Sequence, residues 1–359
     1  MKILIVKTSS LGDVVHTFPA INYLRARFPD ATIDWVAEKR ECDLLAIYPD
    51  VSRVICFDWK QWWNKCRFDA PSRKKFADFV RELRAEKYDL LFDLHGNTKS
   101  AIPTALARAK IKVGFGFKSA PEWPNCLFTN KRYNFPEGLN VRKNYLQLVA
   151  SLFGEEPELV IKKEALKVTA DERSRVDGLL EKCKGPVALI STGSQRIAKN
   201  LEIKTLAAFL QEVGSARGYQ WLFIHGSEEE GDNARILHEH FPENSLIAPK
   251  LSVGELSFLM SRSEILFGMD SFPLHLAEIS GCKTYGFFGP TVGEVYAPPI
   301  VAAHHNFFQS ECPYGMKFVV RCPKERSCKD VACMRLKANA PLAKAMAAHF
   351  LANFTRDIT

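Results

Sequence analysis

The fold of this chain is decided by the stretch Ile3-Leu4-Ile5-Val6-Lys7-Thr8-Ser9-Ser10-Leu11-Gly12-Asp13-Val14-Val15-His16. Its first four residues are apolar and predict a short strand. The apolar spacing between Val14 and Leu24 predicts a helix that stops before Pro29. Residues 32–37 predict a second strand, so the chain begins with a βαβ unit.

Asp13 lies where the first strand gives way to the helix. Ligands of open α/β sheets bind at such junctions, which favours a chemical role for this carboxylate. Aspartate is also a good helix cap, and position alone favours neither role. Ser10 and Gly12 permit a substrate to approach the backbone closely, although both are also ordinary turn residues. No G-x-G-x-x-G pattern is present, so this is no dinucleotide fingerprint.

The composition is typical of a soluble globular protein. The chain has 359 residues, of which 47% are hydrophobic and 25% are charged, and this length suits two domains. No apolar run approaches the roughly 20 residues that span a bilayer, and the N-terminus lacks a signal-peptide pattern. Ten cysteines without such a signal predict reduced thiols and a cytoplasmic protein.

The positive charge is concentrated in the first half of the sequence. Residues 1–150 contain 25 lysines and arginines against 16 acidic residues, whereas residues 151–359 contain 24 against 25. This asymmetry predicts an anionic partner for the first half. Nucleic acid, an anionic lipid surface and a phosphorylated glycan each fit this charge.

Predicted strands and helices alternate through both halves of the chain. Further strands are predicted at residues 54–57, 89–94, 187–191, 221–225, 246–248, 265–268 and 284–288. Helices are predicted at residues 76–87, 204–217, 254–262 and 273–281. This alternation predicts the α/β class, with parallel sheets in two Rossmann-like domains that face a central cleft.

The charged, non-periodic segment 155–169 reads as the linker between the halves. We therefore expect an N-terminal domain over residues 1–160 and a second domain over 161–335. The final segment, 336–359, contains a helix with Leu342, Met346 and Phe350 on one face. An apolar face of this kind predicts that the helix packs back onto the body of the protein.

Four segments in order resemble the ADP-heptose:lipopolysaccharide heptosyltransferases, a family with the two-domain GT-B fold. The opening segment is similar to the heptosyltransferase I version. The others are Asp93-Leu94-His95-Gly96-Asn97-Thr98-Lys99-Ser100-Ala101, Thr192-Gly193-Ser194-Gln195-Arg196-Ile197-Ala198-Lys199, and Asp270-Ser271-Phe272-Pro273-Leu274-His275-Leu276-Ala277 followed by Phe288-Gly289-Pro290-Thr291. Each is weak alone, whereas the ordered set covers nearly the whole chain.

The resemblance implies an inverting transfer of heptose from ADP-heptose to the Kdo/lipid A inner core of lipopolysaccharide. Asp13 would be the base that deprotonates the acceptor hydroxyl. The second half would bind the donor, with one phosphate site at Gly193, Ser194 and Lys199 and another around Asp270. The residues implied at the second site are Asp270, Ser271, Phe272 and His275. Glu230 would contact ribose and Leu251 would contact adenine.

Each donor residue also has an ordinary structural interpretation. Lys199 can be a solvated surface lysine, and Asp270 a simple cap for the helix at Pro273. His275 can be a buried helix residue, Leu251 a core residue, and the acidic triplet that ends at Glu230 a solvated loop. The sequence leaves these alternatives open.

Two departures from the family pattern bear on the donor sugar. Phe272 stands where glycine usually follows Asp-Ser or Asp-Thr, and Asn200-Leu201 replace a usual tryptophan and proline. A bulky residue beside a phosphate reshapes the site. Two alternatives therefore stay open: a GT-B glycosyltransferase that uses another nucleotide sugar, and a non-catalytic glycolipid-binding homologue.

Aromatic and basic residues interleave in segment 57–68, the region that faces the acceptor in the family. Lysine and arginine suit the phosphates and carboxylates of Kdo-lipid A, and tryptophan suits a partly apolar boundary. Lys60 and Lys99 are the implied acceptor contacts, with Gln61 where a second basic residue is expected. The composition also suits single-stranded nucleic acid, or a plain basic surface over a buried aromatic cluster. The resemblance favours the glycolipid and a peripheral place on the cytoplasmic face of the inner membrane.

No Asp-x-Asp pair occurs, so we expect transfer without a metal ion or other cofactor. Cys312, Cys322, Cys328 and Cys333 cluster near the C-terminus. Four cysteines can hold a structural zinc or iron, but no C-x-x-C pair is present, which favours free or packing thiols. The oligomeric state and the acceptor hydroxyl stay open.

Overall fold

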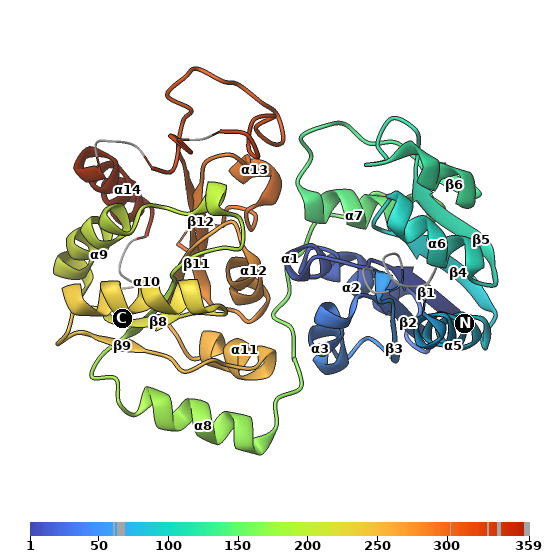
Figure 1. The fold of residues 1–359 in the computed structure, drawn as a ribbon, viewed down its shortest axis with the longest axis horizontal. Coiled ribbons are helices and arrows are strands. Elements are labelled where there is room, and N and C mark those ends of the chain that lie inside the picture. The colour runs from blue at the N-terminus through green and yellow to red at the C-terminus, as the bar shows by residue number, and fades with distance from the viewer. Residues whose placement is uncertain (60–61, 63–68, 302, 329, 336–338, 355–359) are drawn as a thin grey trace. The chain divides into compact units, whose positions relative to one another are not determined.

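The computed structural model describes the chain except for residues 60–61, 63–68, 302, 329, 336–338 and 355–359. The chain divides into two compact units, Met1–Ile161 and Lys162–Thr359 (Figure 1). Residues 155–169, predicted as a linker, form neither helix nor strand, and the boundary between the units falls within them.

The first unit is built on one parallel sheet of six strands. In chain order the strands are β1 (Lys2–Val6), β2 (Thr32–Ala37), β3 (Arg53–Cys56), β4 (Tyr88–Asp93), β5 (Ala109–Phe115) and β6 (Lys131–Tyr133). Their spatial order is β3-β2-β1-β4-β5-β6. The helices are α1 (Leu11–Val15), α2 (Phe18–Arg27), α3 (Lys39–Ile47), α5 (Ala70–Arg84), α6 (Thr98–Leu106) and α7 (Val141–Ala150), with 3₁₀ turns η1 (Trp123–Phe128) and η2 (Ser151–Phe153).

The second unit repeats this plan. Its strands are β7 (Val187–Ser191), β8 (Gln220–Ile224), β9 (Ser245–Ile247), β10 (Ile265–Met269), β11 (Lys283–Phe288) and β12 (His305–Gln309), in the spatial order β12-β11-β10-β7-β8-β9. The helices are α8 (Ala170–Leu180), α9 (Ile203–Arg217), α10 (Glu228–His240), α11 (Val253–Ser261), α12 (Phe272–Ile279), α13 (Gly293–Tyr296) and α14 (Asn339–Asn353), with the 3₁₀ turn η3 (Ile197–Lys199).

Both sheets have the strand order of a doubly wound Rossmann fold, counted from the first strand of each unit. The order reverses between β1 and β4 in the first unit and between β7 and β10 in the second, and each of these pairs is hydrogen-bonded in parallel. A crevice forms beyond the carboxyl ends of the strands at such a reversal, so it is where a ligand binds. The predicted α/β class with two parallel sheets is confirmed.

Buried apolar strands form the centre of each unit. Ile3, Leu4, Ile5 and Val6 of β1 are all fully buried, because helices cover both faces of a parallel sheet. In the second unit, Phe350 of α14 packs against the rings of Phe209 and Phe267, which joins this helix to the core. None of the helices that the structure describes is long and apolar enough to cross a membrane.

One predicted element is wrong in detail. The single helix expected between Val14 and Leu24 is two helices, α1 and α2, which are separated at His16 and Thr17. Pro19 explains the break, because it has no N–H to donate to a preceding carbonyl group and is tolerated only in a first helical turn. The Thr17 hydroxyl donates to the Val14 carbonyl oxygen (2.6 Å) at this break.

Candidate active site

Asp13 caps α1, and part of its carboxylate stays exposed. Its Oδ2 accepts hydrogen bonds from the Ser10 hydroxyl (2.7 Å) and the Ser10 backbone N–H (3.1 Å), which caps α1. Its Oδ1 lies 4.0 Å from Nδ1 of the buried His16, and 39% of the side chain is exposed. Burial alone would raise the pKa of Asp13, but Lys7 and the two Ser10 hydrogen bonds outweigh it and lower the pKa. The group is therefore a charged, accessible carboxylate at the carboxyl end of β1.

Lys7 is the buried cation beside this carboxylate. Its Nζ donates to the Tyr145 hydroxyl (2.7 Å), and only 4% of the residue is exposed. Burial would lower the pKa of Lys7, but the neighbouring Tyr145 and Asp13 raise it. Lys7 therefore stays positively charged and keeps Asp13 ionised. The predicted site residues did not include Lys7, because a lysine at the end of a strand reads as a surface residue.

The loop after β4 is organised by the fully buried carboxylate of Asp93. Its Oδ1 accepts the backbone N–H groups of His95 (3.0 Å) and Gly96 (2.9 Å). Its Oδ2 accepts from Ser100 (3.0 Å), Thr104 (2.8 Å) and Asn125 (2.6 Å). Five donors hold the loop in one conformation. Asp93 therefore acts as the support of this segment.

Gly96 and His95 are positioned by that loop. Gly96 has φ +74°, and a Cβ there would lie 2.8 Å from Pro121, so the turn requires glycine. The Thr8 backbone N–H donates to His95 Nδ1 (3.2 Å), which brings the imidazole to the end of β1. Burial, Lys7 and Lys99 lower the pKa of His95 well below its usual value. The His95 imidazole is therefore neutral, and it lies close enough to the Asp13 carboxylate for that charge to affect its pKa.

The predicted acceptor residues differ in what they contact. Ser10 is exposed, Gly12 is buried in α1, and Lys60 lies outside the described residues. Lys99 Nζ donates to the Ser9 hydroxyl (2.7 Å) and pairs with Glu38 (2.9 Å), and its side chain is 18% exposed. Lys99 is thus attached to the loop that precedes α1, and its contact with an acceptor stays a prediction.

Two aromatic residues of segment 57–68 lie in the core. Phe57 is fully buried and Trp62 is 5% exposed, and both rings pack against Phe79. These two rings support the fold and offer no exposed face to a ligand. Trp59 is half-buried, and the basic residues of the segment lie outside the described residues, so the acceptor role of this segment stays a prediction.

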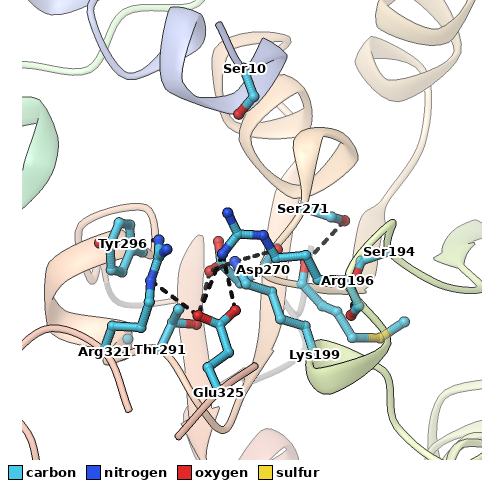
Figure 2. A network of polar contacts seen from close by, with 12 residues as sticks. Ser10, Ser194, Arg196, Lys199, Asp270, Ser271, Thr291, Tyr296, Arg321 and Glu325 are labelled. Carbon is cyan, nitrogen blue, oxygen red and sulfur yellow. Dashed lines mark hydrogen bonds and ion pairs between the residues drawn. The ribbon is translucent and has the colours of Figure 1, made fainter. Parts of the chain in front are cut away.

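In the second unit, Asp270 and Lys199 form the centre of a polar network at the carboxyl ends of β7 and β10 (Figure 2). The Asp270 carboxylate pairs with Lys199, and it accepts from the Thr291 hydroxyl (2.8 Å) and from His275 Nε2 (3.2 Å). Burial would raise the pKa of Asp270, but Lys199 and His275 hold it well below the usual range. The side chains of Asp270 and Lys199 are only 6% and 12% exposed.

This geometry rules out two of the ordinary structural interpretations, and the donor-site roles stay predictions. Lys199 is a largely buried cation and not a solvated surface lysine. Asp270 does not cap α12, because the N-cap residue is Ser271. His275 is 2% exposed and donates to Asp270, since an ionised carboxylate can only accept. A phosphate contact for His275 stays a prediction.

The loop after β7 is braced by Asn200. The Asn200 side chain accepts the Ser194 backbone N–H (2.7 Å) and donates to the Ser194 carbonyl oxygen (3.2 Å). Gly193 has little free space, because a Cβ there would lie 3.0 Å from Glu230 Cγ. The departure at Asn200 therefore has a structural role: it fixes the backbone that leads to Lys199.

Glu230 and Phe272 lie at the starts of α10 and α12. The Glu230 carboxylate accepts the backbone N–H groups of Gly226 (2.6 Å) and Ser227 (3.3 Å), so it caps α10. Phe272 begins α12 and is half-buried, as are Ser271 and Leu251. Contacts of these residues with ribose, phosphate or adenine stay predictions.

Three further residues of the network were not predicted. Glu325 pairs with Arg196 (3.1 Å) and with Arg321 (3.4 Å), and Figure 2 shows the three side chains beside Asp270 and Lys199. Arg196 belongs to a segment that carries the family resemblance, so that segment was a usable signal. Arg321 and Glu325 lie more than a hundred residues further along, and nothing in their local pattern indicates a site.

The four clustered cysteines line one small cavity. Cys312, Cys322, Cys328 and Cys333 are free thiols around a space of about 30 Å³. Burial raises the pKa of Cys333 to about 11, and the three neighbouring cysteines add to this effect. Within the described part of the chain, no group of three or more His, Cys, Asp and Glu side chains is arranged to hold a metal ion.

Comparison with known proteins identifies the family. The family model for glycosyltransferase family 9 (heptosyltransferase) matches residues 76–326. Lipopolysaccharide heptosyltransferase 1 of Escherichia coli K12 is 26% identical over 295 residues, which cover 81% of this chain and 88% of that protein. The E. coli heptosyltransferase WaaC with ADP has a TM-score of 0.71 and 23% identity, and 88% of this chain and 94% of that one are covered. The structure of WaaC with ADP-2-deoxy-2-fluoro heptose has a TM-score of 0.69 and 24% identity, and 87% of this chain and 93% of that one are covered.

Proposed function

The chain belongs to glycosyltransferase family 9, the heptosyltransferases, and from this premise we propose that it transfers a heptose from ADP-heptose to the inner core of lipopolysaccharide. The observation that carries the proposal is the cationic network around Asp270, where Lys199 lies beside the start of α12 at the reversal of strand order. Backbone N–H groups at a helix start and a lysine are what a diphosphate needs.

The donor belongs in the second unit. The E. coli structures named above hold ADP and an ADP-heptose analogue, which supports ADP-heptose as the donor here. Gly193, Ser194 and Lys199 form one side of the donor site, and Ser271, Phe272 and His275 form the other. Asp270 holds Lys199 in place, Glu230 contacts ribose, and Leu251 contacts adenine. ADP leaves with its charge met by protein groups, without a metal ion.

Asp13 is the general base of the transfer. The acceptor hydroxyl oxygen attacks the anomeric carbon as the bond from that carbon to the diphosphate breaks, and the proton passes to Asp13. Inversion at the anomeric carbon follows from this single displacement. The lowered pKa of Asp13 suits a late proton transfer, because the hydroxyl becomes strongly acidic only as its bond to carbon forms. Lys7 keeps the carboxylate charged before the reaction.

The acceptor belongs in the first unit, and we assign it as Kdo-bearing lipid A. The excess of positive charge in residues 1–150 supports an anionic glycolipid, and Ser10, Gly12, Lys60 and Lys99 are the assigned contacts. Two of the aromatic rings in segment 57–68, Phe57 and Trp62, are buried and cannot stack on bases, which weakens the case for nucleic acid. This acceptor places the enzyme in the cytoplasm, at the inner face of the inner membrane.

Release of ADP from ADP-heptose in the presence of Kdo2-lipid A tests this function. We expect ADP release to require both substrates. Release of UDP from UDP-glucose or of GDP from GDP-mannose should be much slower. Faster release of the nucleoside diphosphate from one of those donors would show that the enzyme uses a different nucleotide sugar. Binding of Kdo2-lipid A without release from any donor would indicate a glycolipid-binding homologue without turnover.

A further inference from the structure

The segment over residues 310–334 is joined by its backbone to the loop beside Asp270. Thr291 and Arg321 form an antiparallel bridge. The Val292 N–H donates to the Val320 carbonyl oxygen (3.1 Å), and the Cys322 N–H donates to the Pro290 carbonyl oxygen (2.7 Å). Because the Thr291 hydroxyl also donates to Asp270, Arg321 is held in a fixed place relative to that carboxylate.

Glu325 connects this segment to the loop after β7. Its side chain is 5% exposed and pairs with two arginines, Arg196 and Arg321. The Arg321 guanidinium also lies 5.5 Å from the centre of the Tyr296 ring. The Arg196 guanidinium donates hydrogen bonds to Glu325, whereas Arg321 is attracted to the same carboxylate as an ion pair, so Glu325 draws both guanidinium groups to one place. Arg196 and Arg321 reach Glu325 from different segments, as Figure 2 shows.

The exposed side of this network is positively charged. The network contains three cationic side chains but only two carboxylates. The cations are Lys199, Arg196 and Arg321, and the carboxylates are Asp270 and Glu325. Both carboxylate side chains are at most 6% exposed, whereas those of Arg196 and Arg321 are 47% and 36% exposed. Each guanidinium carries five N–H donors, so donors remain after the contact with Glu325. A ligand that approaches from solvent therefore meets guanidinium groups.

We propose that Arg196 and Arg321, positioned by Glu325, contact the diphosphate of the nucleotide sugar as a second cationic arm of the donor site. This inference rests on the proposed function for the identity of the ligand as a nucleoside diphosphate sugar. Lys199 supplies a point charge, whereas the two arginines supply paired donors that match the geometry of phosphate oxygens. The stretch that carries Arg321 and Glu325 is then part of the donor site.

Calorimetric binding of ADP, AMP and adenosine to the full chain tests the arm. Arg321→Ala and Arg196→Ala should each weaken ADP binding about tenfold, the usual loss for one charge-assisted hydrogen bond. AMP should lose less and adenosine nothing. Arg262→Ala is the matched control, since Arg262 pairs with Asp177 and precedes β10 at the opposite end of the strand. Unchanged ADP affinity in both arm variants would overturn the proposal.

Glu325→Gln distinguishes positioning from a purely structural role. If Glu325 positions the arginines, Glu325→Gln should raise the KM for the donor and leave kcat nearly unchanged. If Glu325 only stabilises the fold, the substitution should lower the melting temperature and leave the ADP affinity of the folded protein unchanged. Arg196→Ala should still fold, because the Arg196 side chain is partly exposed and its truncation removes little packing.

Thiol labelling gives a readout that needs no catalysis. Cys322 is adjacent to Arg321, and Cys328 follows Glu325 by three residues. ADP should slow alkylation of these two cysteines, measured by peptide mass spectrometry, and should not slow it in Arg321→Ala. Equal labelling with and without ADP would contradict the arm. A chain that shows protection but transfers no heptose would instead contradict the proposed function alone.

Discussion

The Thr8 backbone N–H donates to Nδ1 of His95 across 3.2 Å, which fixes the proton of the neutral ring on Nε2. Burial, Lys7 and Lys99 lower the pKa of His95 well below its ordinary value of 6.5. We expect nitrogen NMR to find the neutral Nε2–H form from about pH 6 to about pH 9. Lys99→Met should raise the pKa of His95, and the exposed control Lys110→Met should not. Protonation of His95 near 6.5 in the unmodified chain would contradict this assignment.

Asp13→Asn should lower the rate of heptose transfer by at least about 100-fold, because the amide cannot accept the proton. The fold should survive, since the amide oxygen can still accept from Ser10. The lowered pKa of Asp13 means that the carboxylate is charged at all but acidic pH, so the rate of the unmodified enzyme should show no loss from this group above about pH 4. ADP affinity and transfer rate are the measurements, with Asp30→Asn as control. Undiminished transfer would remove Asp13 as the base.

Lys199→Met should lower the free energy of unfolding by about 3 kcal/mol, because it leaves the Asp270 charge buried without its main partner. Lys283→Met is the matched control. Lys283 pairs with Glu264 at 3.1 Å, but the Glu264 side chain is 44% exposed, so the loss should be below about 1 kcal/mol. Urea unfolding of the two variants measures the difference. Equal losses would mean that Asp270 is compensated by His275 and Thr291 alone.

Glu41 should make the stability of the folded chain depend on pH. Burial raises the pKa of this carboxyl to about 7, and the neighbouring Glu38 adds to the effect. The folded state therefore holds this proton where the unfolded chain has lost it, so stability should fall as pH rises from about 4.5 to about 7 and then level off. Glu41→Gln should remove this slope and stabilise the protein at pH 8 by up to about 3 kcal/mol. Urea midpoints across this range test it, with the exposed Glu137→Gln as control, and an unchanged slope would refute it.

Transfer should proceed without divalent metal. Lys199, the arginine pair and the start of α12 supply the positive charge that a leaving diphosphate needs. We expect EDTA to leave the rate of ADP release unchanged and added magnesium to alter it less than twofold. Elemental analysis of the same preparation provides the control. Loss of activity with EDTA that magnesium restores would show that the proposed charge compensation is incomplete.

The strands that the sequence predicted best are the buried central ones. Residues 32–37 and 187–191 were predicted with the bounds of β2 and β7. Residues 187–190 form a continuous apolar run, as expected of a strand covered on both faces, and β2 keeps a clear apolar signal although Asp34 interrupts it. β5, β6 and β12 were missed, since Ala109–Phe115 contains two lysines, Lys131–Tyr133 begins with two basic residues, and His305–Gln309 is largely polar. All three lie toward the edges of their sheets, where the apolar signal weakens.

The residues of the candidate site were predictable only where they belong to a short sequence motif. Asp13 and Lys199 each stand in a short motif next to a strand, so local pattern and resemblance suffice. The contact between Arg196 and Glu325 joins residues 129 positions apart, and tertiary packing alone creates it. The same applies to Lys7, whose burial depends on Tyr145 of α7.

Neither six-stranded sheet borrows a strand from the other half of the chain. A single cut between Ile161 and Lys162 would therefore break no strand pairing in either sheet. The fragment that starts at Lys162 would contain every residue assigned to the nucleotide, and the fragment that ends at Ile161 would contain the base. Sugar transfer would then require two polypeptides, each of which contains a complete sheet but only part of the residues that the reaction needs.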